Sequence, residues 1–529
     1  MWSRGWRDAV WASLDRPWDV LIIGGGVTGA GLLRLCTFYG LRALLIEARD
    51  FSFGTSSRSS KLVHGGFRYL RNRQFNVTFE SVREREWLLR AAPHLVTPLS
   101  FVLPVYPYYR ASLRQFQMGV LIYDGMALRW QHGKLTPQNL LARCPWLNPT
   151  DLAGGVYYGD ARVDDSRLVL RLLREAVQAG AVALSYARAT ALLRTASGQV
   201  CGAVVRDEAD PHERTAEIRA RVVINATGPW TDDLRQQVGG VPRLRRTRGS
   251  HLVFPHARFP LSEAVTLLHP RDRRAMFAIP WEGVTLLGTT DLDHPKEWED
   301  REPFATSEEI DYLLEALHTV FPGVEAGDQD LIATFAGLRP IIRSGAEHPS
   351  KESRAHSVWD EQGLITITGG KLTTFRRMAL DTLRLAAPYL NLRAVPRPRA
   401  SFFSPAPAEV AAPDLDFETL AYLAGRLGPD LPQFLAEMPP AEWQPIPTLP
   451  NVWAEVRWAA RHEGVVHLED LLLRRVRLGL LLPNGGMDHL DRIRALVQTE
   501  LGWEDARWEA EVNAYRETWW RFYSPRPTG

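Results

Sequence analysis

The sequence predicts a mixed α/β (α+β) body followed by an all-α domain, and three observations support this prediction. An apolar, β-branched run at residues 19–23 ends in closely spaced glycines, as in a strand that turns directly into a helix. Strand-like and helix-like patterns then alternate up to about residue 395. Beyond a stretch rich in proline and alanine, the pattern is helical.

The first unit combines a strand, a glycine-rich turn, a helix and a second strand that ends in an acidic residue. Gly24, Gly26 and Gly29 follow the Gly-x-Gly-x-x-Gly spacing, and Glu47 lies 23 positions after Gly24. Gly24 permits a tight turn, Gly26 lets the backbone approach a pyrophosphate, and Gly29 allows helix and strand to pack closely. The helix N-terminus offers free N–H groups to the anion. Glu47 would accept hydrogen bonds from a ribose diol and repel a 2′-phosphate.

These features predict a dinucleotide-binding βαβ unit with an unphosphorylated adenosine half. A glycine-rich α/β connection without a ligand is the alternative. The motif leaves open which dinucleotide binds.

Further elements follow along the chain. Strands are expected at residues 43–46, 221–224, 251–254, 285–287 and 364–367, and helices at residues 166–179 and 307–320. Residues 396–410 are expected to be a linker, because their prolines continue neither a helix nor a central strand. Helical patterns follow at residues 416–427, 452–463, 468–482, 490–500 and 504–520. The expected organisation is therefore a body at residues 1–395, the linker, and a helical C-terminal domain at residues 411–529.

Composition places the chain among ordinary globular proteins. Its 529 residues are 45% hydrophobic and 23% charged, which excludes the disordered and fibrous classes. The net charge of +2 gives no global electrostatic reason to bind nucleic acid, and the arginine runs at residues 243–248 and 474–477 are expected to be solvated. The 18 tryptophans gather near both ends of the sequence. We expect them to pack within and between domains, with a peripheral membrane surface as the alternative.

Cysteine usage and hydropathy indicate a cytoplasmic protein. Cys36, Cys144 and Cys201 lie far apart, so we expect no disulfide framework, no thiol redox centre and no metal site. The N-terminus lacks the apolar region of a secretory signal. The longest apolar stretch, at residues 20–33, is broken by five glycines, so no segment is expected to span a bilayer.

A loop rich in hydroxyl groups follows the acidic strand end. Residues 55–61 run Thr-Ser-Ser-Arg-Ser-Ser-Lys, and His64 stands beside the paired glycines Gly65 and Gly66. A chain that carries such donors could pass along a pyrophosphate toward the reactive ring. Paired glycines favour a close approach of the backbone to a flat group. A solvated Ser/Thr loop is the alternative.

These motifs closely resemble those of the flavin-dependent glycerol-3-phosphate dehydrogenases, within the wider family of FAD oxidoreductases that includes D-amino-acid and glycine oxidases. The resemblance covers nearly the whole chain. It rests on residues 24–31, 54–70, 92–95, 163–168, 225–230, 249–251, 288–291, 337–340 and 369–374. It implies FAD as the cofactor, and a Rossmann-type FAD-binding domain with an intercalated antiparallel substrate-binding sheet.

The resemblance also assigns residues to the cofactor. The expected FAD-binding residues are Gly24, Gly26, Thr28, Gly29, Glu47, Thr55, Ser56, Ser57, Lys61, Leu62, His64, Gly65, Ala226, Thr227, Gly228, Gly370, Lys371, Leu372 and Thr373. A helix that begins near Thr374 would point its N-terminus at the flavin pyrimidine ring, where its partial positive charge would stabilise the anion that develops at N1 and O2.

Substrate residues follow from the same resemblance. Arg339, Arg354 and Lys371 correspond to phosphate and oxygen ligands, and a phosphoryl dianion does need fixed cations of this kind. Arg354 lies in a polar loop, where a solvated arginine is the alternative. His251 is a further expected substrate contact.

The implied reaction is oxidation of sn-glycerol 3-phosphate to dihydroxyacetone phosphate, with hydride passing from C2 to N5 of FAD. A neutral imidazole suits removal of the hydroxyl proton near neutral pH. We expect His64 to be this base and Arg339 to polarise the developing alkoxide. His251 is the rival base.

No second Gly-x-Gly-x-x-Gly motif follows a strand, so no NAD(P)H domain is expected and the organic substrate is the reductant. The resemblance suggests a membrane quinone as the electron acceptor, or dioxygen in an oxidase. An oxidase of another small hydroxy or amino acid and a non-catalytic flavin-binding scaffold are the alternatives. The expected location is cytoplasmic, with peripheral attachment to the cytoplasmic face of a membrane and a homodimer left open.

Overall fold

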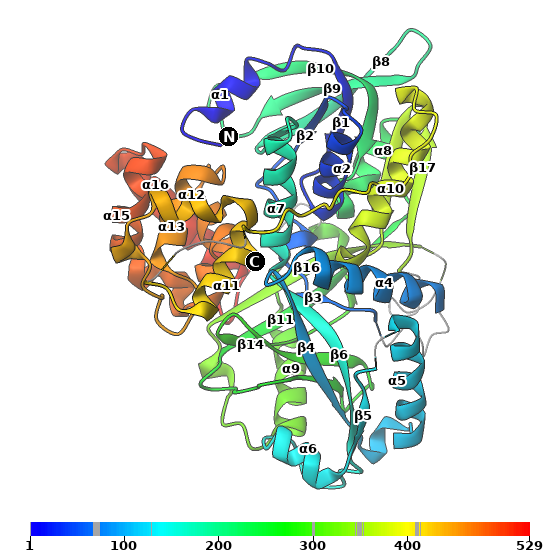
Figure 1. Ribbon diagram of the computed structural model, residues 1–529, viewed down its shortest axis with the longest axis vertical. Helices are drawn as coiled ribbons and strands as arrows, with labels where there is room; N and C mark the ends of the chain where they lie inside the picture. The colour runs from blue at the N-terminus through cyan, green and yellow to red at the C-terminus, as the bar shows by residue number, and fades with distance from the viewer. Residues whose placement is uncertain are drawn as a thin grey trace.

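Two sheets and a helical C-terminal part make up the molecule (Figure 1). The computed structural model describes residues 2–66, 75–128, 130–298, 302–343, 345, 352, 354–407, 412 and 414–529. One sheet occupies the upper half of Figure 1 and the other the lower half, and the C-terminal helices lie beside α7 (Asp165–Gln178). The mixed α/β body with an all-helical C-terminal part confirms the predicted fold class.

The upper sheet has the parallel core that the predicted βαβ unit requires. Its five parallel strands run in the order β18 (Leu364–Gly369), β10 (Thr215–Asn225), β1 (Trp18–Ile23), β2 (Ala43–Ile46) and β7 (Val182–Leu184). Three antiparallel strands extend it, namely β17 (His356–Glu361), β9 (Val200–Asp207) and β8 (Ala187–Arg194). The core strands are buried on both faces, which explains their continuous apolar sequences.

Two glycines of the first motif hold β1 against α2 (Val27–Phe38). A Cβ atom on Gly29 would lie 1.9 Å from the carbonyl oxygen of Gly24, so only glycine permits this contact. Gly24 has a φ of +118°, a conformation that L side chains rarely adopt. The sequence-based roles of these two glycines, close packing and a tight turn, therefore match the structure.

The lower sheet comes from two separate chain segments that flank part of the upper sheet in sequence. Its main path is β15 (Leu292–Asp293), β11 (Leu244–Pro255), β14 (Val284–Gly288), β13 (Ala275–Trp281), β12 (Ala264–Leu268), β4 (Val96–Pro104), β6 (Gly155–Val163) and β3 (Leu62–Val63). β16 (Ala333–Ile342) pairs with β11, and β5 (Gly133–Leu135) pairs with β6. The sheet is antiparallel as predicted, except that β4 and β12 pair in parallel.

Helices cover the two sheets. α10 (Phe375–Ala386) and α7 pack against α2, and α9 (Ser307–Val320) packs against the lower sheet. α9 begins at a capping box of Thr306 and Glu309. The other α-helices among the described residues of the body are α1 (Trp6–Trp11), α4 (Phe75–Ala91), α5 (Leu113–Ala127), α6 (Pro137–Arg143) and α8 (Thr231–Gln236). Among the described helices, none combines the length and the hydropathy needed to cross a bilayer.

The C-terminal part is helical where the sequence predicts helices. Its α-helices are α11 (Phe417–Leu427), α12 (Leu431–Glu437), α13 (Trp453–His462), α14 (Leu478–Leu481), α15 (Leu490–Leu501) and α16 (Asp505–Phe522). Residues 468–482 do not form the single continuous α-helix that their pattern predicts. They contain a π-helical turn at Asp470–Arg475, and Arg477 then adopts a left-handed φ of 65°.

The predicted linker is anchored rather than loose over its described residues. Phe402 and Phe403 are buried, the Phe402 carbonyl accepts a hydrogen bond from Arg34 Nε at 3.1 Å, and Ser404 N donates to Glu175 at 2.8 Å. Residues 408–410 of the predicted linker lie outside the described residues. The division of the chain at residues 396–410 stays a prediction.

The expectation that both arginine runs are solvated is wrong for the second. Arg474, Arg475 and Arg477 are each at most 1% exposed, because carboxylates of the body reach them. In the first run, Arg248 is also buried, where it pairs with Glu309. The tryptophans near both ends follow the packing interpretation, with Trp2, Trp11, Trp508 and Trp519 buried and Trp520 exposed.

Candidate active site

An elongated cleft is lined by residues of both sheets. It comprises two neighbouring cavities of about 620 Å³ and 470 Å³. Both cavities are lined by Thr55, Ser59, Pro340, Gly370, Lys371 and Leu372. The smaller cavity includes the glycine turn after β1, and the larger one includes a cluster of arginines from the lower sheet and from the segment before β17. Two neighbouring cavities of this size suit an extended dinucleotide with a second small molecule beside it.

Most of the predicted cofactor residues line this cleft. The smaller cavity is lined by Gly24, Gly26, Thr28, Glu47, Thr55, Ser56, Ala226, Thr227 and Gly228, and the larger one by Leu62, His64 and Thr373, with Gly370, Lys371 and Leu372 shared. Gly29, Ser57, Lys61 and Gly65 do not line either cavity. The resemblance assigned these four residues to the cofactor, whereas only the folded backbone decides which residues line a cavity.

Glu47 stands at the start of the cleft. Its carboxylate accepts hydrogen bonds from the backbone N–H groups of Gly25 at 2.6 Å and Arg49 at 2.9 Å. Burial raises the pKa of Glu47, while these two N–H groups lower it. The carboxylate lines the smaller cavity beside the glycine turn, and its hydrogen bonding to a ribose diol stays a prediction.

The hydroxyl-rich loop closes over the N-terminus of α2. Ser56 Oγ accepts a hydrogen bond from Val27 N at 2.9 Å, and Thr55 Oγ1 donates to the Leu338 carbonyl at 2.5 Å. A Cβ atom on Gly26 would lie 3.0 Å from Ser56 Oγ, so glycine keeps this part of the cleft open. The loop therefore joins the dinucleotide end of the cleft to the lower sheet.

Lys61 points away from the cleft, although we expected it to bind the cofactor. Its ammonium group is fully buried and lies 3.0 Å from Asp165. It also donates to the Ser57 carbonyl at 2.5 Å. Burial lowers the pKa of Lys61 to about 7, with a further lowering by Arg477 and an opposing effect of Asp165.

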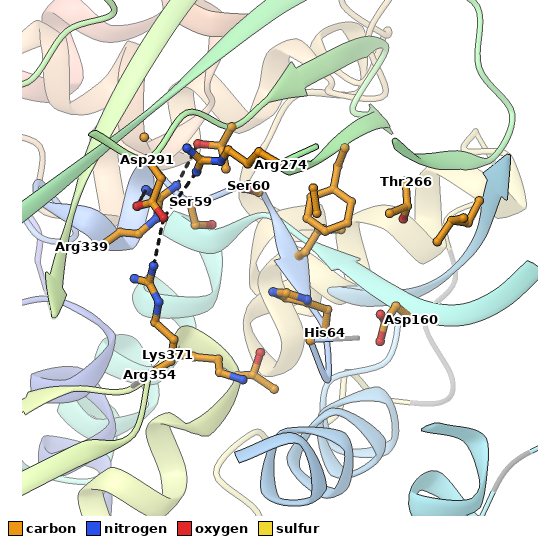
Figure 2. Close-up of a pocket in the computed structure, with 18 of the residues that line it drawn as sticks. Ser59, Ser60, His64, Asp160, Thr266, Arg274, Asp291, Arg339, Arg354 and Lys371 are labelled. Atoms are coloured by element: carbon orange, nitrogen blue, oxygen red, sulfur yellow. Dashed lines mark hydrogen bonds and ion pairs between the residues drawn. The ribbon is translucent and has the colours of Figure 1, made fainter. Parts of the chain in front are cut away.

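Asp291 gathers three arginines at the far end of the larger cavity. Its carboxylate is 2% exposed and lies 3.0 Å from Arg339 Nη1, 3.3 Å from Arg354 Nη2 and 3.5 Å from Arg274 Nη2. Figure 2 shows the guanidinium groups of Arg274 and Arg354 directed at this carboxylate from different elements. The Arg354 side chain is 9% exposed, which argues against the solvated alternative.

Arg339 is also held by its neighbours on the lower sheet. Its guanidinium donates to Thr289 Oγ1 at 2.8 Å and to the Thr290 carbonyl at 3.2 Å. A Cβ atom on Gly249 would lie 2.0 Å from Arg339 Nη2, so a glycine is required for this arginine to cross the neighbouring strand. Lys371 lies across the cleft and donates to Ser81 Oγ at 2.6 Å.

The two histidines occupy different environments. His64 follows β3, lines the larger cavity, is partly exposed and has Phe277 at a ring distance of 6.1 Å. His251 is 2% exposed and stacks on Phe335 at 4.6 Å. Its Nε2 lies 2.8 Å from Ser60 Oγ. Burial, followed by the positive charges of Arg339 and Lys61, holds the pKa of His251 well below its usual range, so this imidazole stays neutral.

Three residues of the site were missed by sequence reasoning. Asp291 ends the Gly-Thr-Thr-Asp motif at residues 288–291, which was noted for resemblance but not for a role. Arg274 comes from a polar turn before β13, and Ser60 from the hydroxyl-rich loop. Asp291 could have been found from its motif, whereas no local signal distinguishes Arg274 from the other arginines in its turn.

Apolar side chains line another part of the larger cavity, which we call the apolar arm. They come from the lower sheet (Leu103 and Phe277), from the segment before α5 (Tyr109) and from α5 itself (Phe116, Met118 and Ile122). Met118 and Ile122 belong to this lining and are 57% and 42% exposed. The apolar arm therefore has exposed apolar side chains of α5 in one of its walls.

Comparison with known proteins agrees with this geometry. Residues 19–376 match the model of a family described as FAD dependent oxidoreductase, and residues 371–508 match the C-terminal domain of alpha-glycerophosphate oxidase. The chain is 38% identical over 392 residues to an aerobic glycerol-3-phosphate dehydrogenase of Staphylococcus epidermidis, covering 73% of this chain and 70% of the relative.

Solved structures show the same fold. A glycerol-3-phosphate dehydrogenase from Bacillus halodurans, complexed with FAD, is 29% identical with a TM-score of 0.79, and the match covers 100% of this chain and 99% of that one. An L-alpha-glycerophosphate oxidase from Mycoplasma pneumoniae with FAD bound is 19% identical, covers 74% of this chain and 99% of its own, and has a TM-score of 0.58. The latter likeness concerns the fold alone.

Proposed function

Because this chain belongs to the glycerol-3-phosphate dehydrogenase and oxidase family of FAD dependent oxidoreductases, we propose that it oxidises sn-glycerol 3-phosphate to dihydroxyacetone phosphate. The convergence of Arg274, Arg339 and Arg354 on one carboxylate carries this proposal. Guanidinium groups held in this way suit a phosphoryl dianion, which accepts several charge-assisted hydrogen bonds at once.

The remaining charges of the cavity agree with a phosphorylated substrate. Of the described residues that line the larger cavity, five carry cationic side chains and two carry carboxylates. The cationic ones are Arg58, Arg274, Arg339, Arg354 and Lys371, and the carboxylates are Asp160 and Asp291. An amino acid or hydroxy acid has a single carboxylate to bind, so this arrangement favours a phosphate ester over those alternatives.

We assign to His64 the removal of the hydroxyl proton from the substrate. His64 lines the same cavity as the arginines and is partly exposed, so its imidazolium form can be hydrated. Protonated His251, by contrast, would be a buried cation next to Arg339 and Lys61. In this scheme His64 removes the proton, Arg339 stabilises the developing alkoxide, and the remaining cations hold the phosphate. FAD, when bound, supplies the acceptor of the hydride that leaves C2.

The apolar arm supports a quinone as the electron acceptor. Phosphate and a three-carbon polyol need only the polar end of the cavity, whereas the arm along α5 matches a flat apolar ring with an apolar tail. Dioxygen would need no such channel. This observation favours a dehydrogenase over an oxidase within the family.

The surface around the apolar arm suits peripheral attachment to a membrane. Seven of the twelve most exposed large apolar side chains of the described residues lie there, namely Phe75, Phe79, Met118, Leu121, Ile122, Leu128 and Trp130. α4 and α5, which carry most of them, lie side by side (Figure 1). The exposed arginines Arg83, Arg110 and Arg114 border this surface and suit anionic lipid head groups. The cytoplasmic face of a membrane is the matching location.

One experiment tests the reaction directly. The purified holoenzyme should be yellow and should bleach anaerobically when glycerol 3-phosphate is added. Full retention of colour at saturating substrate would overturn the proposal. Inorganic phosphate and glycerol 2-phosphate should slow bleaching by competition, whereas glycine and lactate should neither bleach the flavin nor compete.

The acceptor and the base need their own measurements. Reoxidation of the reduced enzyme by a water-soluble quinone should be much faster than by air, and equal rates would contradict the quinone assignment.

His64→Asn should remove the acidic limb of the pH profile of kcat/KM. His251→Asn should keep that limb, because the imidazole of His251 stays neutral across this range.

A further inference from the structure

The helical C-terminal part reaches the dinucleotide end of the cleft through buried arginines. Arg474, Arg475 and Arg477 follow one another in the π-helical turn and the residues after it, and all three contact the body. We call these three residues the arginine clamp. None of them lines either cavity.

Arg477 holds the hydroxyl-rich loop from behind. Its Nη2 donates to the Ser57 carbonyl at 2.9 Å and to Asp165 Oδ1 at 2.8 Å. Lys61 donates to the same carbonyl and the same carboxylate. The backbone of the loop is therefore fixed at Ser57 by two buried cations, one from the body and one from the helical C-terminal part.

The other two arginines of the clamp hold the start of the same segment. Arg475 donates to both carboxylate oxygens of Asp50 at 2.7 Å, and Arg474 Nε donates to Asp50 Oδ2 at 2.5 Å. Asp50 lies two residues before Ser52, whose N–H donates to the carbonyl of Gly25 at 3.0 Å. The clamp thus fixes the segment between Asp50 and Ser57 at both ends.

The residues that face the cleft lie between these two fixed points. Phe53, Gly54, Thr55 and Ser56 line the smaller cavity, and Ser56 accepts the hydrogen bond from the N-terminus of α2. A displacement of Ser57 would move Ser56 and Thr55 because they are its neighbours in a short 3₁₀ turn at Thr55–Ser57. The clamp can therefore set the shape of the cleft without touching its contents.

We propose that Arg477 is a positioning residue for FAD, through which the helical C-terminal part determines how tightly the cofactor is held. The inference rests on the FAD assignment and not on the substrate or acceptor. The test of this inference measures cofactor binding and not turnover. The inference about Arg477 can therefore fail while the proposed reaction stands, and the proposed reaction can fail while the inference stands.

A matched control is available at the same interface. Arg174 is also buried, bridges α7 to the helical part through Asp430 Oδ2 at 2.7 Å, and contacts none of the residues between Asp50 and Lys61. Substitution of Arg174 weakens the docking of the helical part without releasing the loop. Any effect that is specific to Arg477 therefore reports on the loop.

The test compares Arg477→Met and Arg477→Lys with Arg174→Met in the full-length holoenzyme. The dissociation constant of FAD is measured from the recovery of flavin fluorescence on dilution. The visible circular dichroism of the bound flavin reports on the surroundings of the flavin, and thermal unfolding reports on the stability of each variant. We expect Arg477→Met to weaken FAD binding by about 10-fold or more and to change the visible dichroism, because Ser57 loses one of the two buried cations that fix it. Arg477→Lys should have a smaller effect, and Arg174→Met should leave both signals within about twofold of the parent.

Two results would overturn the inference. One is FAD binding by Arg477→Met within about twofold of the parent, and the other is an equal weakening by Arg174→Met at an equal loss of stability. If Arg477→Met does not fold, Arg477→Lys decides by the same criteria. Faster backbone hydrogen exchange at residues 52–60 in Arg477→Lys, but not in Arg174→Lys, would be the supporting result, and equal exchange in both would contradict it.

Discussion

The molecule contains two clusters of buried or half-buried arginines that differ in their partners. In the clamp, Arg474, Arg475 and Arg477 meet carboxylates of both the body and their own helical part, namely Asp50, Asp164, Asp165, Glu469 and Asp470. Among the residues that the structure describes, Arg274, Arg339 and Arg354 converge in the site on the carboxylate of Asp291. A buried cation with matched carboxylates is costly to disturb, whereas cations that line a cavity can still bind an anion. Whether the arginines lie in a buried network or line a cavity therefore separates a structural cluster from a binding one.

The largest effect is expected in the site cluster. Arg339→Ala should lower kcat/KM for glycerol 3-phosphate by roughly three orders of magnitude, because it removes a charge that we place at the reacting oxygen. FAD content should stay at the level of the parent, which steady-state kinetics and the flavin absorbance check together. Activity within about twofold of the parent would contradict the assigned role of Arg339.

The next effect tests whether the clamp is structural. Asp50→Asn should lower the free energy of unfolding by about 3–5 kcal/mol, because Arg474 and Arg475 lose their shared carboxylate in a buried place. Denaturant unfolding of the holoenzyme measures this loss. Phosphate should raise the unfolding temperature of the parent but should not restore that of Asp50→Asn. Recovery of the variant by phosphate would show that the clamp binds anions and would remove the distinction between the clusters.

A third change sharpens the role of Arg354 in the site cluster. Arg354→Ala should raise the KM for glycerol 3-phosphate by about 10- to 100-fold with little change in kcat, since it removes one charge-assisted hydrogen bond to the phosphate. The inhibition constant of inorganic phosphate should rise by the same factor. A fall in kcat with an unchanged KM would place Arg354 at the reacting carbon instead of at the phosphate.

The smallest effect concerns pH and the clamp. Asp164 caps α7 and lies 3.0 Å from Arg426 and 3.6 Å from Arg477. Although burial by itself raises the pKa of Asp164, these arginines lower it to about 2, below the value of 3.8 in an unfolded chain. Its contribution to stability is therefore fully present above pH 3.8 and is lost as the pH falls toward 2.

Asp164→Asn keeps a capping side chain but removes this charge. The parent should lose about 2 kcal/mol more stability than the variant between pH 4 and pH 2. Denaturant unfolding at a series of pH values checks the difference. Parallel curves for the two proteins would show that the charge of Asp164 does not stabilise the clamp.

Much of the fold could be predicted from the sequence because its signals are local. The βαβ unit follows from an apolar strand, three glycines and an acidic strand end within 29 residues, and the structure shows why Gly24 and Gly29 are needed. The helices of the C-terminal part follow from periodicity and from caps such as Asp416. Resemblance supplied the longer pattern that brings Arg339, Arg354 and Lys371 to one cavity.

The sequence alone determined the parallel core, the helical C-terminal part and the residue types of the site. Only the tertiary structure decided that Arg474, Arg475 and Arg477 are buried, that Lys61 faces Asp165, and that Arg274 joins Arg339 and Arg354 at Asp291. Hydrophobic period and turn chemistry act between near neighbours in the chain, so the sequence carries them directly. The state of a charged side chain depends instead on partners such as Asp50 and Arg475, which are 425 residues apart and meet only after folding.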